Sequence, residues 1–268
     1  MKYRTTFKDW ILKAWLGTKS LIRYTTNTCK AGTFEIPSNY KLVFSDNFMN
    51  DYKINWIEAS HWWAQPYHPD FLDAWFDPAQ ITQGNEGIEF NISAKPRYFP
   101  EVDTTMRAAG TSIKSKEAWQ YGIFKFIAKL PSGPQLWPAL WLTGNFSWPP
   151  EIDLLEGYSN NSDDYDNGIR LLSNVHMTYK GGKNDVGSAR HRLSNKVTEE
   201  FIEYVIWWEE DFIKLYYNGY LVRHITDKKA LETMNETMVI VVGAGNQKEF
   251  NQTAKTPMIV NRVAVYQK

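Results

Sequence analysis

Apolar residues recur at every second position in 88–92 and again in 124–128 of this chain. A period of two is typical of β-strands that bury one face. Runs rich in β-branched and aromatic residues predict further strands at Phe201–Trp208, Met238–Val242 and Met258–Tyr266. From about residue 36 onward, the pattern therefore indicates a series of short strands.

Turn signals separate these strands, and helical periodicity is scarce. Asn218-Gly219 stands between two apolar runs and readily takes the positive φ angles of a type I′ turn, so it predicts a hairpin. Asp227–Asn235 is the one short helix candidate after the N-terminal region. Because strands do not alternate with helices, we expect an all-β fold, an antiparallel sandwich or barrel.

The first 36 residues differ from the rest in pattern and in charge. Within residues 1–30, seven basic residues accompany a single acidic one, although the whole chain has 30 of each. Apolar residues between positions 7 and 15 recur at helical spacing. We therefore divide the chain into a basic amphipathic extension, residues 1–36, and a main domain, residues 37–268. The extension is either a docking arm for a partner, an anionic surface or a membrane interface, or a terminal helix packed against the domain.

Composition narrows the classes of function. A net charge of zero does not indicate a protein that wraps a polyanion, so no nucleic-acid partner is expected. A single cysteine, Cys29, excludes an intramolecular disulfide framework and a cysteine-built zinc site. No apolar stretch approaches the ~18 residues that a membrane-spanning helix needs. Aromatic residues make up 15% of the chain, including 12 Trp, which favours a ligand with flat faces such as a sugar or a nucleobase.

The candidate chemistry concentrates in Glu151-Ile-Asp-Leu-Leu-Glu156. In a regular strand Glu151 and Asp153 share one face, whereas Glu156, five positions from Glu151, points to the other. One extra residue bulging at Leu154 and Leu155 would return Glu156 to the face of the other two acids. We therefore predict a β-bulge at the paired leucines.

The bulge sets an expected distance between the outer acids. Four strand steps of ~3.3 Å place the Cα atoms of Glu151 and Glu156 ~13 Å apart, and inclined side chains would bring the carboxyl groups to ~5 Å. Retaining glycosidases have this separation, with one carboxylate as nucleophile and the other as acid and base. The competing interpretation is a solvated acidic face or a cation site with oxygen ligands.

Two tryptophans precede the acidic segment. Trp137 and Trp141 stand four positions apart in Trp137-Pro-Ala-Leu-Trp141, so on a strand their indoles share a face. Indole rings can cover the apolar C–H faces of sugar rings. The pair therefore favours carbohydrate chemistry at the acids.

These motifs, in this order, resemble glycoside hydrolase family 16. The resemblance covers about residues 40–267 and rests on Leu42-Val-Phe-Ser-Asp-Asn-Phe48, Tyr121-Gly-Ile-Phe-Lys125, Leu130-Pro-Ser-Gly133, Trp137-Pro-Ala-Leu-Trp141, Glu151-Ile-Asp-Leu-Leu-Glu156, Tyr204-Val-Ile-Trp-Trp208, Tyr217-Asn-Gly219 and Ile259-Val-Asn-Arg-Val-Ala-Val-Tyr266. It implies a β-jelly-roll sandwich with a substrate cleft on the concave face. It also implies hydrolysis of β-linked glucans or galactans with retention.

The resemblance assigns catalytic roles by position. It makes Glu151 the nucleophile, Glu156 the acid and base, and Asp153 their electrostatic helper. Many members have Gly before the first Glu, where this chain has Pro150, which would alter how the chain enters the strand. The intact acids argue against a non-catalytic carbohydrate-binding jelly roll. A transglycosylase shares the same acids and stays open.

Four further residues are candidates for substrate binding. Trp137 and Trp141 would border the donor-side subsites. His176, in Asn174-Val-His-Met177, would lie in the cleft on a neighbouring strand or else be an ordinary structural histidine. Trp148 would line the cleft or pin a loop.

The spacing of the acids also indicates a subgroup. Two residues between Asp153 and Glu156 resemble the laminarinase, agarase and carrageenase branches. Trp137-Pro-Ala-Leu-Trp141 favours β-1,3-glucan or mixed-linkage β-glucan, with an agarose, carrageenan or porphyran type of galactan as the alternative. A basic group after the acids would sense sulfate or carboxylate, or else form an exposed basic loop: Arg170, Lys180, Lys183, Arg190, His191 and Arg192.

Metal and location follow from the same resemblance. Many members bind a structural calcium through an Asp near the last strand, and Asn261 stands at the matching position, so we expect no metal and no cofactor. Action outside the cell is expected for a polysaccharide hydrolase. Asp9 and Lys13 interrupt the only early apolar stretch, so no signal peptide is recognisable. We expect either a leader absent from this sequence or delivery with a larger particle through the basic extension.

Overall fold

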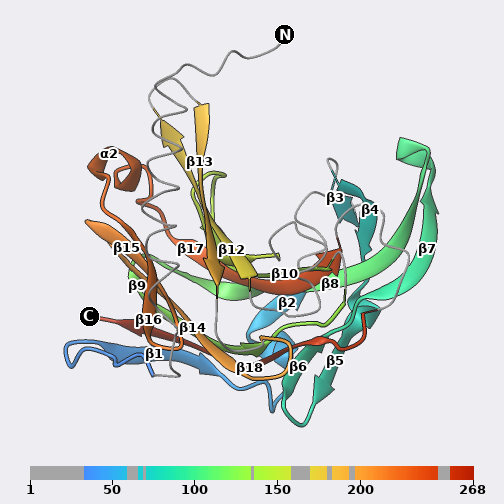
Figure 1. Cartoon of the computed structure of the whole chain (residues 1–268), viewed down its shortest axis with the longest axis horizontal. Helices are drawn as coiled ribbons and strands as arrows, with labels where there is room; N and C mark the ends of the chain where they lie inside the picture. The colour runs from blue at the N-terminus through green and yellow to red at the C-terminus, as the bar shows by residue number, and fades with distance from the viewer. Residues whose placement is uncertain are drawn as a thin grey trace.

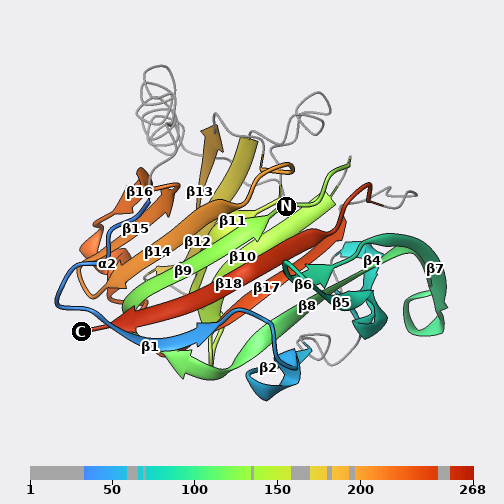
Figure 2. The same ribbon diagram turned by 90° about the horizontal axis from the view of Figure 1, so that it is seen from below.

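The computed structural model describes most of the main domain. The described residues are 33–58, 66–68, 71–133, 136–157, 170–179, 183–192, 197–246 and 254–268. They form two large β-sheets stacked face to face (Figures 1 and 2). The predicted all-β sandwich is therefore confirmed.

The smaller sheet forms the lower layer in Figure 1 and faces the reader in Figure 2. Its strands follow the order β16-β15-β14-β9-β18-β6-β5, and β1 pairs with β18. Their bounds are β1 Lys41–Asp46, β5 Ile81–Gly84, β6 Gly87–Phe90, β9 Gly122–Lys129, β14 Ile202–Glu209, β15 Phe212–Tyr217, β16 Tyr220–Ile225 and β18 Met258–Gln267. The predicted strands near 88–92, 124–128, 201–208 and 258–266 all belong to this sheet.

The larger sheet curves upward at both ends, so its outer face is concave (Figure 1). Its order is β13-β12-β11-β10-β17-β8-β4-β3, and β2 and β7 also pair with β8. Its strands are β2 Trp56–Glu58, β3 Tyr67–His68, β4 Phe71–Phe76, β7 Ser93–Phe99, β8 Thr104–Trp119, β10 Leu136–Gly144, β11 Glu151–Glu156, β12 Arg170–Tyr179, β13 Lys183–Arg192 and β17 Met238–Asn246. All of its described pairings are antiparallel except that of β4 with β8.

Helical segments within the described residues are short. They are the 3-10 helices η1 Tyr52–Ile54, η3 Pro78–Gln80 and η4 Pro100–Val102, and the α-helix α2 Lys228–Leu231. Asp227 caps α2, since its carboxylate accepts hydrogen bonds from the backbone N–H groups of Lys229 and Ala230. The predicted helix at Asp227–Asn235 is thus confirmed in place but is shorter. No described helix has both the length and the apolar character that crossing a membrane requires.

The predicted hairpin at Asn218-Gly219 is confirmed. Both residues have positive φ angles, 46° and 75°, and Tyr217 pairs directly with Tyr220 across the turn. Positive φ at both central positions is the type I′ geometry that matches the twist of the flanking strands. The turn therefore fixes how β15 passes into β16.

A single large apolar core lies between the sheets and holds the acidic strand in place. Ile152, Leu154 and Leu155 of β11 are fully buried in it, together with Tyr204 and Trp208 of β14. Burial of one such side chain stabilises a fold by roughly 1.5–3 kcal/mol. The apolar residues of β11 thus anchor the strand from below, which leaves its acids for the opposite face.

A short segment before β1 covers part of the outer face of the smaller sheet. Phe34 is buried there, with its ring centroid 5.9 Å from that of Trp207 and 4.7 Å from that of Tyr216. Its backbone N–H donates to Glu203 Oε1 at 2.5 Å. Residues 33–36, which the division at residue 36 assigns to the extension, therefore pack against the domain. The amphipathic pattern at 7–15 lies outside the described residues.

Candidate active site

The predicted β-bulge is present in β11. Trp141 of β10 pairs with Asp153 and the preceding Leu140 pairs with Leu155, so Leu154 is the extra residue in the ladder. Both leucines point into the core. A bulged strand returns the next residue to the face it would otherwise leave, and Glu156 consequently lies on the concave side with Glu151 and Asp153.

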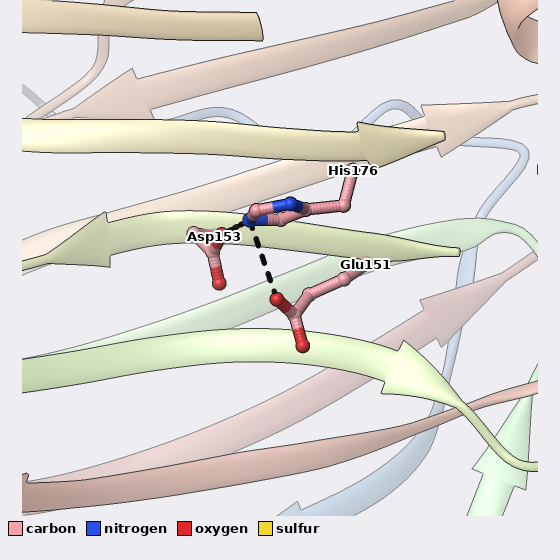
Figure 3. A group of neighbouring side chains, drawn as sticks. All are labelled: Glu151, Asp153 and His176. Carbon is pink, nitrogen blue, oxygen red and sulfur yellow. Dashed lines mark ion pairs between the residues drawn. The ribbon is translucent and has the colours of Figure 1, made fainter. Parts of the chain in front are cut away.

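His176 joins two of these acids. It stands opposite Glu151 on β12, and its Nε2 lies 3.5 Å from Glu151 Oε1 and 3.3 Å from Asp153 Oδ2. Figure 3 shows the three side chains converging. The imidazole of His176 can donate to the carboxylates of Glu151 and Asp153, so these three side chains can pair with one another without a metal ion. Their proximity alone therefore does not make this group a metal site.

Two side chains hold Glu156 from either side. The Asn174 side-chain amide donates to Glu156 Oε2 from β12, and the Trp137 indole also hydrogen-bonds this carboxylate. Asn174 pairs with Asp153 across the ladder, two positions before His176, so both lie on the concave face. Strand alternation from His176 would have found Asn174, which the sequence prediction does not include among the site residues.

The predicted tryptophan pair shares the concave face. Trp141 pairs with Asp153 and packs against Val239 and Val241 of β17, while Trp137 reaches Glu156. The two indoles therefore border the acids on the side of β10 and β17.

Trp148 reaches the site from the connection between β10 and β11. Its ring centroid lies 5.5 Å from that of His176, its side chain hydrogen-bonds Glu151, and about half of it is exposed. Glu236 holds this connection, because its carboxylate accepts from Phe146 N and Ser147 N at 3.2 Å and from Ser147 Oγ at 2.8 Å. Trp148 thus both lines the site and belongs to a fixed loop. Nothing in the sequence pattern indicates Glu236, which lies almost ninety residues away.

Burial governs the electrostatics of the acids. Desolvation raises the pKa of Glu151 to about 8, helped by the negative charge of Asp153 and opposed by His176 and the Trp148 hydrogen bond. Burial and the charge of Glu156 raise the pKa of Asp153 well above its ordinary value. Burial also raises the pKa of Glu156, against the hydrogen bonds from Asn174 and Trp137. The set therefore retains a proton near neutral pH, and this proton belongs to the group rather than to one residue.

A partly buried cation lies behind the site. The Arg223 guanidinium of β16 donates to Ser173 O at 3.0 Å, to Ser173 Oγ at 3.2 Å and to Gly187 O at 2.7 Å. Its charge opposes the rise in the pKa of Asp153. Desolvation lowers the pKa of Arg223 itself to about 10, so the group stays charged at neutral pH.

The sequence predicts that the basic group after the acids either senses sulfate or carboxylate on the substrate or forms an exposed loop. This prediction is wrong for His191. This residue is buried on the core side of β13, where its Nε2 lies 2.7 Å from Ser173 Oγ. Burial and the Arg223 charge lower the pKa of His191 to about 3, so it is neutral. Arg190 is exposed on the same strand, while Lys180 lies outside the described residues. Arg170, Lys183 and Arg192 fall within β12 and β13 rather than in a loop.

The position expected for calcium has an amide instead. Asn261 Nδ2 donates to the Glu86 carbonyl oxygen at 2.7 Å. Calcium is bound by oxygen ligands, and this contact directs the N–H group of the amide at the Glu86 carbonyl oxygen. Asn261 thus has a protein partner and lacks the carboxylate of the expected calcium ligand, and the absence of a metal stays a prediction.

Known proteins resemble this chain in sequence. The beta-glucanase of Rhodothermus marinus is 28% identical over 209 residues, which are 72% of this chain and 69% of the relative. Endo-1,3-1,4-beta-glycanase EglC of Rhizobium meliloti is 28% identical over 188 residues, 68% of this chain but only 37% of the relative.

Solved structures share the fold at low sequence identity. The laminarinase catalytic domain of Thermotoga maritima has a TM-score of 0.70 at 19% identity, covering 85% of this chain and 98% of that one. Porphyranase B of Zobellia galactanivorans has a TM-score of 0.69 at 15% identity, covering 90% and 98%. Residues 73–258, more than half of the chain, match glycosyl hydrolases family 16 as a family. This chain, with three acids brought to one face by a bulge, therefore belongs to glycosyl hydrolases family 16.

Proposed function

We propose that this glycoside hydrolase cleaves β-glucan internally by a retaining double displacement. The observation that carries the proposal is the bulge at Leu154, which places Glu151 and Glu156 on one concave face with Asp153 between them. Retaining hydrolysis requires two carboxyl groups that flank the scissile glycosidic bond, roughly 5–5.5 Å apart, one to attack the anomeric carbon and the other to protonate the leaving oxygen. The carboxyl separation of ~5 Å expected from the strand rise stays a prediction.

Glu151 is the proposed nucleophile. In the first step its carboxylate attacks the anomeric carbon, the bond to the leaving sugar oxygen breaks, and a glycosyl ester forms. His176 and Trp148 both direct hydrogen-bonding groups at Glu151, which favours its ionised form. These contacts offset part of the burial that raises the pKa of Glu151.

Glu156 is the proposed acid and base. Its proton passes to the leaving oxygen in the first step, and its carboxylate then takes a proton from the water that attacks the ester. Repulsion among the like charges of three buried carboxyl groups disfavours ionisation of all three at once, so the set holds the proton that this step needs. Asp153 is therefore the proposed electrostatic partner of both glutamates.

The aromatic residues support a glucan as the substrate. Trp137, Trp141 and Trp148 lie around the acids, and indoles stack on sugar faces without requiring charge. The relatives that are 28% identical to this chain include a beta-glucanase and an endo-1,3-1,4-beta-glycanase. We therefore place β-1,3-glucan or mixed-linkage β-glucan first.

A galactan is the second candidate substrate. Porphyranase B is among the similar structures, and Arg190 is exposed near the site strands. Against this, buried His191 is neutral and cannot pair with sulfate. A galactan would therefore have to be recognised by other groups.

Digestion of a glycan panel tests the proposal. Laminarin, mixed-linkage β-glucan, agarose, carrageenan and porphyran are incubated with the protein and with Glu151→Gln, and reducing ends are measured. Internal cleavage of a β-glucan by the parent alone is the expected result. Sizing the products of a defined oligosaccharide separates hydrolysis from transglycosylation, because only the latter gives products longer than the substrate. Turnover by Glu151→Gln within tenfold of the parent contradicts the assignment of Glu151 as nucleophile.

A partner for the basic extension is a separate proposal. Seven basic residues against one acidic residue in 1–30 would favour an anionic surface or an acidic partner. Because Phe34 packs on the domain, a deletion of residues 1–32 removes the arm without exposing this contact. The deletion is expected to abolish association with the acidic partner or anionic surface and to leave hydrolysis unchanged. Association that survives the deletion contradicts a docking role for residues 1–32.

A further inference from the structure

The bulged residue of the acidic strand has a hydrogen-bond partner in the opposite sheet. Tyr217 of β15 donates from its hydroxyl to the Leu154 carbonyl oxygen at 2.5 Å, and both residues are fully buried. Leu154 is the residue that has no pairing partner on β10. A bulged residue leaves the sheet ladder, so its carbonyl needs a partner elsewhere, and Tyr217 supplies one from across the core.

The bulge decides which face Glu156 occupies. A strand that slips by one residue sends every following side chain to the other face. If Leu154 rejoined the ladder, Glu156 would point toward the core instead of lying near Asn174 and Glu151. The leucine side chains alone select the bulge weakly, because an apolar group is accommodated at many orientations. A directional hydrogen bond to one carbonyl is far more selective.

Tyr217 is itself held rigidly. It immediately precedes the type I′ turn at Asn218-Gly219, and Asn218 bonds to the backbone of Glu203 in both directions, through its own N–H and its side-chain oxygen. The Tyr204 ring lies 5.3 Å from the Tyr217 ring at an interplanar angle of 76°. The hydroxyl therefore has a fixed place from which to hold Leu154.

The neutral His191 ring also packs against Tyr217. It lies 5.4 Å from the Tyr217 ring at 88°, edge to face. Arg223 donates to Ser173 Oγ, which leaves the Ser173 hydroxyl proton to donate to His191 Nε2. This chain of donors fixes the His191 ring, which in turn limits the movement of Tyr217.

We propose that Tyr217 is a positioning residue, whose hydroxyl holds the Leu154 bulge and so keeps Glu156 on the catalytic face. The inference rests on the proposed role of Glu156 as acid and base. Tyr217 touches no substrate, and its effect passes entirely through the backbone of β11. The sequence gives no local sign of this role, because sixty-three residues separate the two partners.

The test is Tyr217→Phe, which keeps the ring and removes the hydroxyl. Turnover of β-glucan is expected to fall about tenfold or more, with KM little changed, because proton transfer by Glu156 contributes ~10²–10⁴-fold. An aryl glycoside with a good leaving group needs no proton in the first step, so its glycosylation rate should fall much less. Added azide should restore part of the loss in the second step and give a β-glycosyl azide, because azide needs no base. Unchanged turnover of β-glucan overturns the proposal.

Tyr204→Phe is the matched control, since it removes a hydroxyl from the adjoining buried ring. It is expected to keep the parental ratio of β-glucan turnover to aryl glycoside turnover. If Tyr204→Phe changes this ratio as much as Tyr217→Phe does, Tyr217 has no specific role. Glu156→Ala is the reference for lost acid and base function. If azide fails to rescue Glu156→Ala, the proposed function fails, whereas rescue of Glu156→Ala without any effect of Tyr217→Phe defeats only this inference.

Deletion of Leu154 gives a second, independent test of the proposed role of Tyr217. Without this residue, Asp153 and Leu155 match Trp141 and Leu140 in consecutive register, so no bulge is needed. In the deletion background Tyr217→Phe should change β-glucan turnover less than twofold, since the coupling between the two sites is gone. An undiminished effect of Tyr217→Phe in that background shows that the hydroxyl acts elsewhere and overturns the proposal.

Discussion

His176 Nε2 lies 3.5 Å from Glu151 Oε1, and the two residues are direct partners on neighbouring antiparallel strands. The imidazole opposes the rise in the pKa of Glu151 that burial causes. His176→Ala should therefore raise the pKa of Glu151 further. Activity requires an ionised nucleophile and is lost as the pH falls through this pKa, so the acidic limb of the kcat/KM profile should move to higher pH.

The matched control for this shift is His224→Ala. His224 lies on β16 against Phe212, on the smaller sheet. Its removal is expected to leave the acidic limb in place. An acidic limb that His176→Ala does not move, or moves to lower pH, contradicts the contact between His176 and Glu151 as a source of nucleophile ionisation.

Substitution of the two glutamates should separate their roles. Glu156→Gln cannot protonate the leaving oxygen, so β-glucan turnover should fall by about 10²–10⁴-fold, while an aryl glycoside with a good leaving group is glycosylated at a more nearly parental rate. Glu151→Gln should remove both activities and keep sugar binding, because the amide forms no glycosyl ester. Steady-state rates with both substrates and equilibrium binding to Glu151→Gln provide the measurements. Equal losses of both substrates in Glu156→Gln contradict its role as acid.

The same burial should make stability depend on pH at Glu151. Its pKa is about 8 in the folded chain against an ordinary value of 4.5, so between these values the folded state holds a proton that the unfolded state releases. Stability therefore falls as the pH rises from 4.5, and the full cost is present above about 8. Glu151→Gln carries no charge, so its Tm should exceed the parental Tm above pH 8, and the difference should shrink toward pH 4.5.

Thermal unfolding across this pH range checks the expectation. Glu35→Gln, which removes a carboxylate from an exposed position, is the control and should show a small and nearly constant difference from the parent. A Tm difference for Glu151→Gln that grows toward low pH has the wrong sign and refutes the raised pKa of this residue.

The bulge could be predicted from the sequence because it depends on local pattern. Glu151 and Glu156 have the wrong spacing for a shared face, and Leu154-Leu155 supplies one apolar residue too many, so chemistry and alternation together require the extra residue. Trp137 and Trp141 followed from the same period of two. The type I′ turn at Asn218-Gly219 is likewise a property of adjacent residues.

The remaining contacts could not be predicted because they join distant segments. Arg223 reaches Ser173 from another sheet, and no local pattern links these two residues. The basic neighbours of His191 indicate a solvent-facing segment, whereas alternation along β13 turns its side chain into the core. Charge in a sequence therefore indicated solvent exposure less reliably than strand period did.

Removal of divalent cations should leave the fold unchanged. Asn261 Nδ2 already donates to the Glu86 carbonyl oxygen, and this contact needs no ion. The Tm measured in excess EDTA should equal the Tm in excess calcium, because a ligand that binds only the folded state would raise it. Asn261→Asp serves as the comparison, since a carboxylate there offers oxygen and should make the Tm calcium-dependent. A parental Tm that EDTA lowers and calcium restores contradicts the expectation of no structural metal.

Glu236 should control substrate affinity through the loop that carries Trp148. Its carboxylate accepts the N–H groups of Phe146 and Ser147 as well as the Ser147 hydroxyl, and it can approach only because Gly144 has no Cβ, which would lie 2.2 Å from Glu236 Oε1. Glu236→Ala frees the loop, so the Trp148 indole loses its fixed place. A lost aromatic contact of ~0.5–1.5 kcal/mol corresponds to a KM for β-glucan that rises about 2–10-fold.

Gly144→Ala tests the same contact between Glu236 and the loop from the side of the loop. A Cβ at Gly144 would lie 2.2 Å from Glu236 Oε1 and 2.3 Å from the Ser147 carbonyl oxygen. This substitution should therefore displace the loop and raise KM at least as much as Glu236→Ala does, and the double variant should raise KM by less than the product of the two single effects because both act on this loop. Glu232→Ala, at an exposed carboxylate next to α2, is the control and should leave KM unchanged. Suppose that Glu236→Ala and Gly144→Ala both keep the parental KM while their thermal unfolding resembles that of the parent. The indole of Trp148 then binds sugar equally well without the support of Glu236, and its position does not limit substrate binding.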